Sequence, residues 1–263
     1  MKTFAAPGIS AFSLLLTLAA LTSCQKELST NNPALNPVYD LNISFKPVID
    51  GQPLLFNETY RNVFGEAYQV TAFKYYVYDI RLLNTDSNFV TQVGKDEHYL
   101  VDASATASST ISAKPIARTY NRISFRVGVD SSRNFSGAQT GALDPAKGMF
   151  WTWSSGYIMA KLEGSSPLSA QPNNRIEYHI GGFKDPDNVV KNITLDFPAL
   201  QAVRFLPGSS STINITANVN AWFSNPNEVR ISANAVCMTP GELAKKIAAN
   251  YAGMFAITNI QGN

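Results

Sequence analysis

A long run of aromatic and β-branched residues constrains the fold of this 263-residue chain most strongly. It spans residues 68–83 and reads YQVTAFKYYVYDIRLL. Such residues suit the pleated surface of a β-strand. Val70, Ala72 and Phe73 break the strict alternation of apolar positions ahead of Tyr75–Tyr78. The mixed pattern therefore predicts one long strand interrupted by a bulge.

Several other segments also have the character of strands, and clusters of Asn, Gly, Pro and Ser separate them. They are YDLNISFKPVI (39–49), HYLVD (98–102), RISFRVGVD (122–130), MFWTWSSGYIMAKLEG (149–164), NRIEYHIGG (174–182), VVKNITLDF (189–197) and STINITANVNAWF (211–223). Many short strands at this spacing are typical of a sandwich or barrel. We expect an all-β fold, an antiparallel β-sandwich of the Greek-key type.

One helix is predicted near the C-terminus. Thr239, Pro240 and Glu242 match a capping box, with threonine as the N-cap and glutamate at the third helical position. Leu243 and Ile247 follow at helical spacing and give this helix an apolar face. We expect the helix to cover one end of the sandwich.

The N-terminus has the form of a bacterial lipoprotein signal. Lys2 precedes a short apolar run that ends in Leu21-Thr22-Ser23-Cys24, which predicts cleavage before Cys24 and acylation of its thiol. Residues 1–23 are then a signal peptide, residues 24–37 a polar flexible tether, and residues 38–263 one β-sandwich domain. Gln25, in place of an aspartate, favours the outer membrane of the cell envelope, and the leaflet that the protein faces cannot be read from the sequence.

Charge and cysteine content narrow the functional classes. Lys and Arg total 21 against 19 Asp and Glu, and no basic stripe is visible, so nucleic acid is not an expected partner. With Cys24 committed to lipid, Cys237 is left without a disulfide partner. Its apolar neighbours indicate a small buried hydrophobic residue, with a soft metal ligand beside Met238 as the alternative.

Two tryptophans one residue apart stand out within residues 149–164. Trp151 and Trp153 would project from the same side of one strand. Packing in the core or on a sheet surface is the first interpretation, and a stacking surface or a redox neighbourhood is the second.

Five segments together resemble one known family. They are LNISFKPVIDGQPL, YRNVFGEAYQVTAFKYYVYDIRLL, HYLVD, residues 123–164 with the series Gly-Val-Asp, Gly-Ala-Leu-Asp-Pro, Trp-Thr-Trp and Gly-Tyr, and IEYHIGGF. The chain resembles the MbnP-like copper-binding family, known from methanobactin gene clusters and from surface copper proteins of methane oxidisers. The resemblance implies a mononuclear copper site with two histidines, a tryptophan oxidised to kynurenine, and a di-haem peroxidase-like partner protein.

The chain has two histidines, His98 and His179, and each falls in a segment that matches a family histidine segment. Neutral imidazole nitrogen suits copper, and the resemblance brings both rings to one ion. The family's modified tryptophan precedes the first histidine by two residues, where this chain has Asp96, so kynurenine cannot form there. Asp96 could instead add an oxygen ligand, which would favour Cu(II) or zinc. Met149, Met159 and Met238 are possible soft ligands, and Trp151, Trp153 and Met149 are possible neighbours of the site.

Other polar groups have simpler interpretations. Asp130 and Asp144 sit in turns, where aspartate side chains bond to nearby backbone, and calcium binding there is the alternative. Asp185 and Asp187 indicate a solvated loop. The sequence contains no hydrolase or phosphate-binding motif.

Two functional hypotheses follow. The first is a lipid-anchored envelope protein that binds copper for acquisition, buffering or delivery and is not itself an enzyme. The second is an interaction module without a metal, which binds a partner protein or a glycan through exposed aromatic side chains.

Overall fold

The computed structural model describes residues 1–3, 37–153, 156–200 and 202–262. Within these residues the chain forms a nine-stranded sheet, a five-stranded sheet and the two-stranded pair of β7 (Thr119–Tyr120) and β13 (Val203–Arg204). The predicted signal peptide, the tether and Cys24 lie almost wholly outside the described residues, so those predictions remain untested.

The larger sheet runs in the order β12, β8, β4, β10, β11 and β15, with β3 and β5 also paired to β4 and with β9 paired to β10. Its strands are β3 (Thr59–Arg61), β4 (Ala67–Asn84), β5 (Phe89–Asp102), β8 (Arg122–Val127), β9 (Phe150–Trp151), β10 (Gly156–Ser165), β11 (Arg175–Gly181), β12 (Lys191–Asp196) and β15 (Val236–Cys237).

The smaller sheet runs in the order β16, β14, β1 and β2, and β6 also pairs with β1. Its strands are β1 (Asp40–Ile49), β2 (Gln52–Pro53), β6 (Thr110–Ala113), β14 (Ser210–Asn218) and β16 (Phe255–Gln261). The prediction of a mostly β fold is thus confirmed, but an entirely antiparallel arrangement was wrong. β1 pairs with β14 in parallel, and β11 pairs with β15 in parallel.

The predicted interruption of the long strand is present, since β4 shifts register against β10 between Val70 and Ala72. A second interruption, which was not located from the sequence, follows at Asp79. β4 pairs with β5 in two registers that change between Tyr78 and Ile80, and Asp79 between them has a φ of 49°. A residue with this backbone conformation bulges out of the ladder and redirects the strand. Along one edge, the first half of β4 pairs with β10, and the second half pairs with β8.

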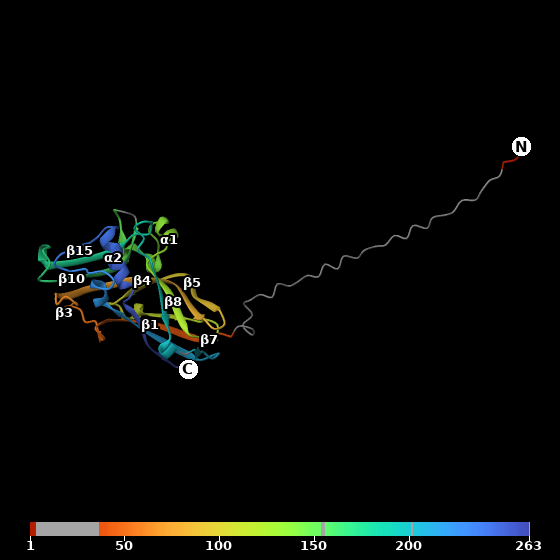
Figure 1. Cartoon of the computed structure of the whole chain (residues 1–263), viewed down its shortest axis with the longest axis horizontal. Helices are drawn as coiled ribbons and strands as arrows, with labels where there is room; N and C mark the ends of the chain where they lie inside the picture. Colours follow the sequence, from red (N-terminus) through yellow and green to blue (C-terminus); the bar gives the residue numbers. More distant parts are fainter. Residues whose placement is uncertain (4–36, 154–155, 201, 263) are drawn as a thin grey trace.

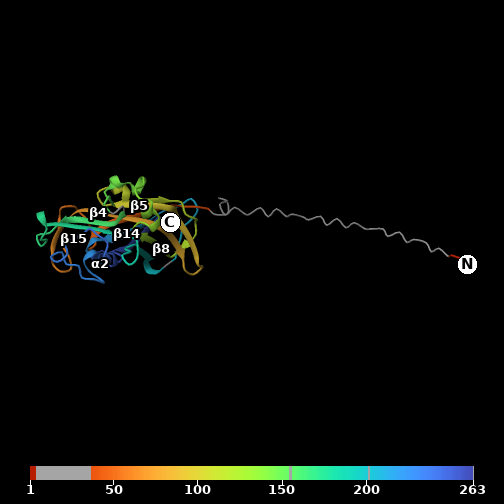
Figure 2. The same ribbon diagram turned by 90° about the horizontal axis from the view of Figure 1, so that it is seen from above.

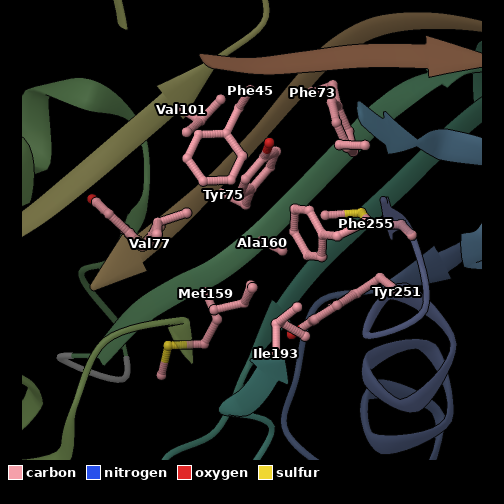
Figure 3. Packing of buried hydrophobic residues seen from close by; sticks show 14 of the residues in the cluster. Phe45, Phe73, Tyr75, Val77, Val101, Met159, Ala160, Ile193, Tyr251 and Phe255 are labelled. Carbon is pink, nitrogen blue, oxygen red and sulfur yellow. The ribbon is translucent and has the colours of Figure 1, made fainter. Parts of the chain in front are cut away.

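The two sheets pack face to face around an aromatic core (Figure 3). Phe45 of β1 meets Tyr75 of β4 at 6.2 Å between ring centroids, and Phe255 of β16 meets Tyr75 at 5.6 Å. All three side chains are buried. Edge-to-face contacts of this kind add to the free energy of burial and join strands that are far apart in sequence.

The helices are α1 (Ser131–Phe135) and α2 (Glu242–Tyr251), with short 3₁₀ helices at η1 (Thr106–Ser109), η2 (Gly141–Leu143), η3 (Pro145–Lys147), η4 (Pro172–Asn174), η5 (Pro198–Leu200) and η6 (Val219–Phe223). The segment around α1, drawn in green, and α2, drawn in blue, lie on opposite sides of the large sheet (Figure 2). Tyr251 of α2 packs on Trp222 at 5.2 Å between ring centroids.

The C-terminal helix exists but begins two residues later than predicted. Its N-cap is Gly241, which has a φ of 141°, and no side chain caps the helix. Pro240 is held against Gly182, where an added Cβ would meet the proline Cβ at 3.4 Å. Tertiary packing therefore places the bend at Gly241, and the capping box predicted from Thr239 was wrong.

Candidate metal centre

The two histidines lie on the same face of the large sheet but in different places. His98 of β5 pairs with Tyr78 of β4. His179 of β11 pairs with Lys161 of β10, which pairs in turn with Lys74 of β4. Three inter-strand steps and four residues of strand therefore separate the two rings, or roughly 20 Å.

One copper ion cannot join these histidines in this fold, because its two donor atoms must each lie about 2 Å from the metal. The prediction that His98 and His179 share a site is corrected by the strand register. The expectation that both histidines bind one ion came from the family resemblance. The strand order of the sheet places the two histidines far apart. The two residues are considered separately from here.

His98 is a buried imidazole with an unsatisfied nitrogen. Its side chain is 5 % exposed and stacks on Tyr78, with ring centroids 4.7 Å apart and planes 13° apart. Nε2 lies 3.2 Å from Oδ2 of Asp130. Nε2 has no partner in hydrogen-bonding geometry among the described residues, while the Asp130 carboxylate interacts with it electrostatically. The stack fixes the ring, and this nitrogen is buried without a hydrogen bond.

Asp130 reaches His98 because it also caps α1. Its Oδ1 accepts a hydrogen bond from the backbone N–H of Arg133 at 3.0 Å, so the carboxylate is fixed with Oδ2 toward the imidazole. Asn134 holds α1 against the sheet, since its side chain donates to the carbonyl of Val129 and accepts from the N–H of Tyr157. The turn predicted at Asp130 is therefore present, and it serves a second purpose.

His98 and Asp130 open onto a cleft of about 460 Å³. The opposite wall carries Asp79, whose carboxylate lies 2.8 Å from Nε of Arg81 and 3.3 Å from Nε of Arg126. Arg81 and Arg126 thus pair with Asp79, and Arg126 also interacts electrostatically with Asp130. The cleft thus presents one imidazole and one carboxylate side by side.

Burial determines the charge state of His98. Removal from water lowers the pKa of the His98 imidazole below its ordinary value. The Asp130 carboxylate raises this pKa, and the Arg133 guanidinium lowers it, but burial has the largest effect. The ring is therefore neutral at pH 7, which is the state in which imidazole binds metals.

His179, in contrast, has a hydrogen-bond partner for its Nε2. Its Nε2 lies 2.6 Å from Oε1 of Glu163, and Nζ of Lys161 lies 3.1 Å from the same oxygen. The hydrogen bond from His179 holds the pKa of Glu163 at about 2, against the effect of burial and with further lowering by Lys161. This nitrogen has a strong partner and is not a free ligand.

The comparison with known proteins identifies the family. The MbnP family model matches residues 38–239. The chain belongs to the MbnP family. Among solved structures, MbnP from Methylosinus trichosporium is similar, with 16 % identity and a TM-score of 0.50 over 74 % of this chain and 80 % of that chain. At this identity the likeness concerns the fold. No curated protein matches the chain.

Within this MbnP-family fold, the tryptophan pair does not share one strand. β9 ends at Trp151, which is 5 % exposed, whereas Trp153 lies beyond the strand and is 63 % exposed. The ring centroids are 5.3 Å apart. The predicted common strand was wrong, because residues 149–164 form a hairpin of β9 and β10 instead of one continuous strand.

Of the sulfur ligands considered from the sequence, Met149, Met159 and Cys237 lie in the core, whereas Met238 is half-buried. Met149 and Met159 are fully buried, and Sδ of Met159 accepts the backbone N–H of Val129 at 3.0 Å. Cys237 is a free, buried thiol whose pKa is raised to about 11 by burial. A protonated thiol is a poor metal ligand, which favours its interpretation as a small core residue.

Asp96 belongs to β5, but its side chain is outside the part of the chain that the structure describes. Among the described residues, no three His, Cys, Asp or Glu side chains gather closely enough to hold a metal ion.

Sequence reasoning did not assign Asp130 and Tyr78 to the site. Asp130 begins a short helix, so its local pattern indicates a cap and nothing more. Tyr78 is one of many tyrosines in β4. The sequence did single out Asp130 in one way, because this residue belongs to the Gly-Val-Asp motif that contributed to the family resemblance.

Proposed function

We propose that this chain is a copper-binding protein of the MbnP family in which His98 and Asp130 bind the ion. The observation that carries the proposal is the buried Nε2 of His98, which has no hydrogen-bond partner among the described residues and lies 3.2 Å from Oδ2 of Asp130. Two neighbouring donors that each lie about 2.1 Å from one ion are about 2.9 Å apart in a tetragonal site and about 3.4 Å apart in a tetrahedral one. The observed spacing fits that requirement.

The donor set favours Cu(II). A carboxylate oxygen and an imidazole nitrogen suit Cu(II) or zinc, whereas Cu(I) prefers sulfur and imidazole ligands. Two protein ligands in a cleft of about 460 Å³ leave positions open for exchange with a donor or an acceptor molecule. These features support buffering or delivery of copper, without a catalytic step performed by this chain.

We place this activity at the cell envelope. The support is the lipoprotein signal that ends at Cys24, which predicts a lipid anchor in the outer membrane. Among the described residues, no helix combines the length and the apolar character that crossing a bilayer requires. We also propose a di-haem peroxidase-like partner protein, on the basis of the family resemblance.

Electron paramagnetic resonance of the mature protein loaded with one equivalent of Cu(II) tests the proposed ligands. We expect a spectrum with one imidazole nitrogen and oxygen donors, and the same spectrum for His179→Ala as the matched control. A spectrum that requires two imidazoles would contradict the His98–Asp130 site. Failure of the protein to retain copper against a weak chelator would contradict copper binding itself.

A further inference from the structure

We propose that a second cleft, formed by Trp151, Tyr157, Phe183 and the loop at Asp185, binds a neutral saccharide. This aromatic cleft has a volume of about 280 Å³, and its lining residues do not include any that line the His98 cleft. The volume is near the lower end of the range for small-molecule sites. The inference is independent of copper binding.

The walls of the aromatic cleft are built from buried rings. Trp151 is 5 % exposed, and Gly181 makes room for its indole, since a Cβ there would lie 2.4 Å from the ring. The indole Nε1–H is buried without an acceptor among the described residues. This N–H is closed off from solvent, so a ligand in the cleft would contact the indole ring and not this group.

Two exposed aromatic side chains pack on rings that line this cleft. Of the aromatic residues that the structure describes, Phe135 and Trp153 are the ones in the exposed class, at 67 % and 63 %. Trp153 packs on Trp151 at 5.3 Å between ring centroids, and Phe135 packs on Phe183 at 5.1 Å. They come from separate segments of the chain, so their convergence at one cleft is a property of the tertiary structure.

The rim of the cleft carries charges that lack strong partners. Asp185 has no hydrogen bond or ion pair with any described residue, and Asp187 has its nearest cation, Nζ of Lys245, at 3.7 Å. Lys184 lies over the rings of Phe135 and Phe183, with Nζ 4.8 Å and 5.3 Å from their centroids. Carboxylates accept hydrogen bonds only, so the ligand must bring donors.

A saccharide satisfies all of these features. The C–H face of a pyranose ring packs on aromatic rings by dispersion and burial of apolar surface. Its hydroxyls donate to the carboxylates of Asp185 and Asp187 and accept from Lys184. A proline-rich peptide would stack on the rings but brings few donors for the carboxylates. Nucleic acid would be repelled by the two aspartates.

The test uses the full mature chain and three probes, which are cellohexaose, maltohexaose and chitohexaose. Tryptophan fluorescence and calorimetry should show binding of at least one probe with a dissociation constant below about 1 mM. Trp153→Ala should weaken that binding about tenfold, and Asp185→Asn about fivefold. The exposed Leu168 gives a matched control, since Leu168→Ala should leave the affinity unchanged.

Two outcomes would overturn the proposal. One is the absence of binding for all three saccharides at about 10 mM. The other is binding of decaproline instead, with the same loss on Trp153→Ala, which would identify a peptide site. Both substitutions are at exposed positions, and a thermal unfolding curve for each variant confirms that the fold is intact.

Discussion

His98 and His179 are two buried imidazoles on the outer face of one sheet, and each lies beside a carboxylate. His179 is hydrogen-bonded to Glu163, which also pairs with Lys161. His98 faces Asp130 at 3.2 Å without a hydrogen bond, and its ring is fixed by stacking on Tyr78. An imidazole that is hydrogen-bonded to its neighbours, such as His179, contributes to the stability of the fold. An imidazole that is held in place without a hydrogen bond, such as His98, is suited to bind a ligand.

The largest difference between substitutions of His98 and His179 should be in the affinity for copper. His98→Ala should lower the affinity for Cu(II) at least about 100-fold, because a single carboxylate cannot hold the ion selectively. His179→Ala should change the affinity less than about threefold, because that ring is far from the ion. Titration against a competing chelator measures both. Equal losses in the two variants would restore the shared two-histidine site.

The pH dependence of copper binding should follow His98. Burial lowers the pKa of this imidazole, so the ring is neutral and competent above its ordinary value of about 6.5. Protons compete with copper only below the folded pKa, where the affinity should fall about tenfold for each pH unit. Copper titrations from pH 8 to pH 4 measure this. A decline that starts above pH 7 would contradict the lowered pKa.

The pH dependence of protein stability, unlike that of copper binding, should follow Glu163. Its pKa is held at about 2 in the folded chain, below its value of 4.5 when unfolded. A lowered acid pKa stabilises the fold above pH 4.5, and this contribution is lost as the pH falls from 4.5 to 2. The full shift is discounted because the Glu163 side chain is 32 % exposed. Glu163→Gln should therefore cost about 1 kcal/mol at pH 7.

Urea unfolding of the wild type and Glu163→Gln at pH 7 and at pH 2.5 measures this difference, which should shrink at the lower pH. Asp130→Asn is the contrasting variant, because asparagine keeps the cap on α1 while the carboxylate is removed. It should leave the free energy of unfolding nearly unchanged and weaken copper binding. A large loss of stability would show that Asp130 is mainly structural.

The smallest effect should come from the ring beneath His98. Tyr78→Leu removes the aromatic stack but keeps an apolar side chain at this buried position. The imidazole would then sample other orientations, and the affinity for Cu(II) should fall about two- to threefold. The pH midpoint of binding should stay within about 0.3 units. No change in affinity would show that packing from other neighbours suffices to orient His98.

Local pattern predicted the elements better than their partners. The aromatic run of residues 68–83 predicted β4 and a break at Val70 to Phe73, where β4 shifts register against β10. The second bulge, at Asp79, was not located by the sequence pattern. The continuous strand through Trp151 and Trp153 was wrong, because the turn of a hairpin replaces it there. The helix start was also wrong, since Pro240 packs on Gly182 and the helix begins after Gly241.

By itself, the sequence determined that the chain is mostly β, that a helix follows residue 239, and that it belongs to the MbnP family. These follow from periodicity and from motifs that are short and local. Tertiary structure alone decided that β1 pairs with β14 in parallel, that Asp130 meets His98, and that His179 lies three strands away. The physical reason is that strand order and register depend on hydrogen bonds between distant segments, and an alternating pattern does not specify its partner.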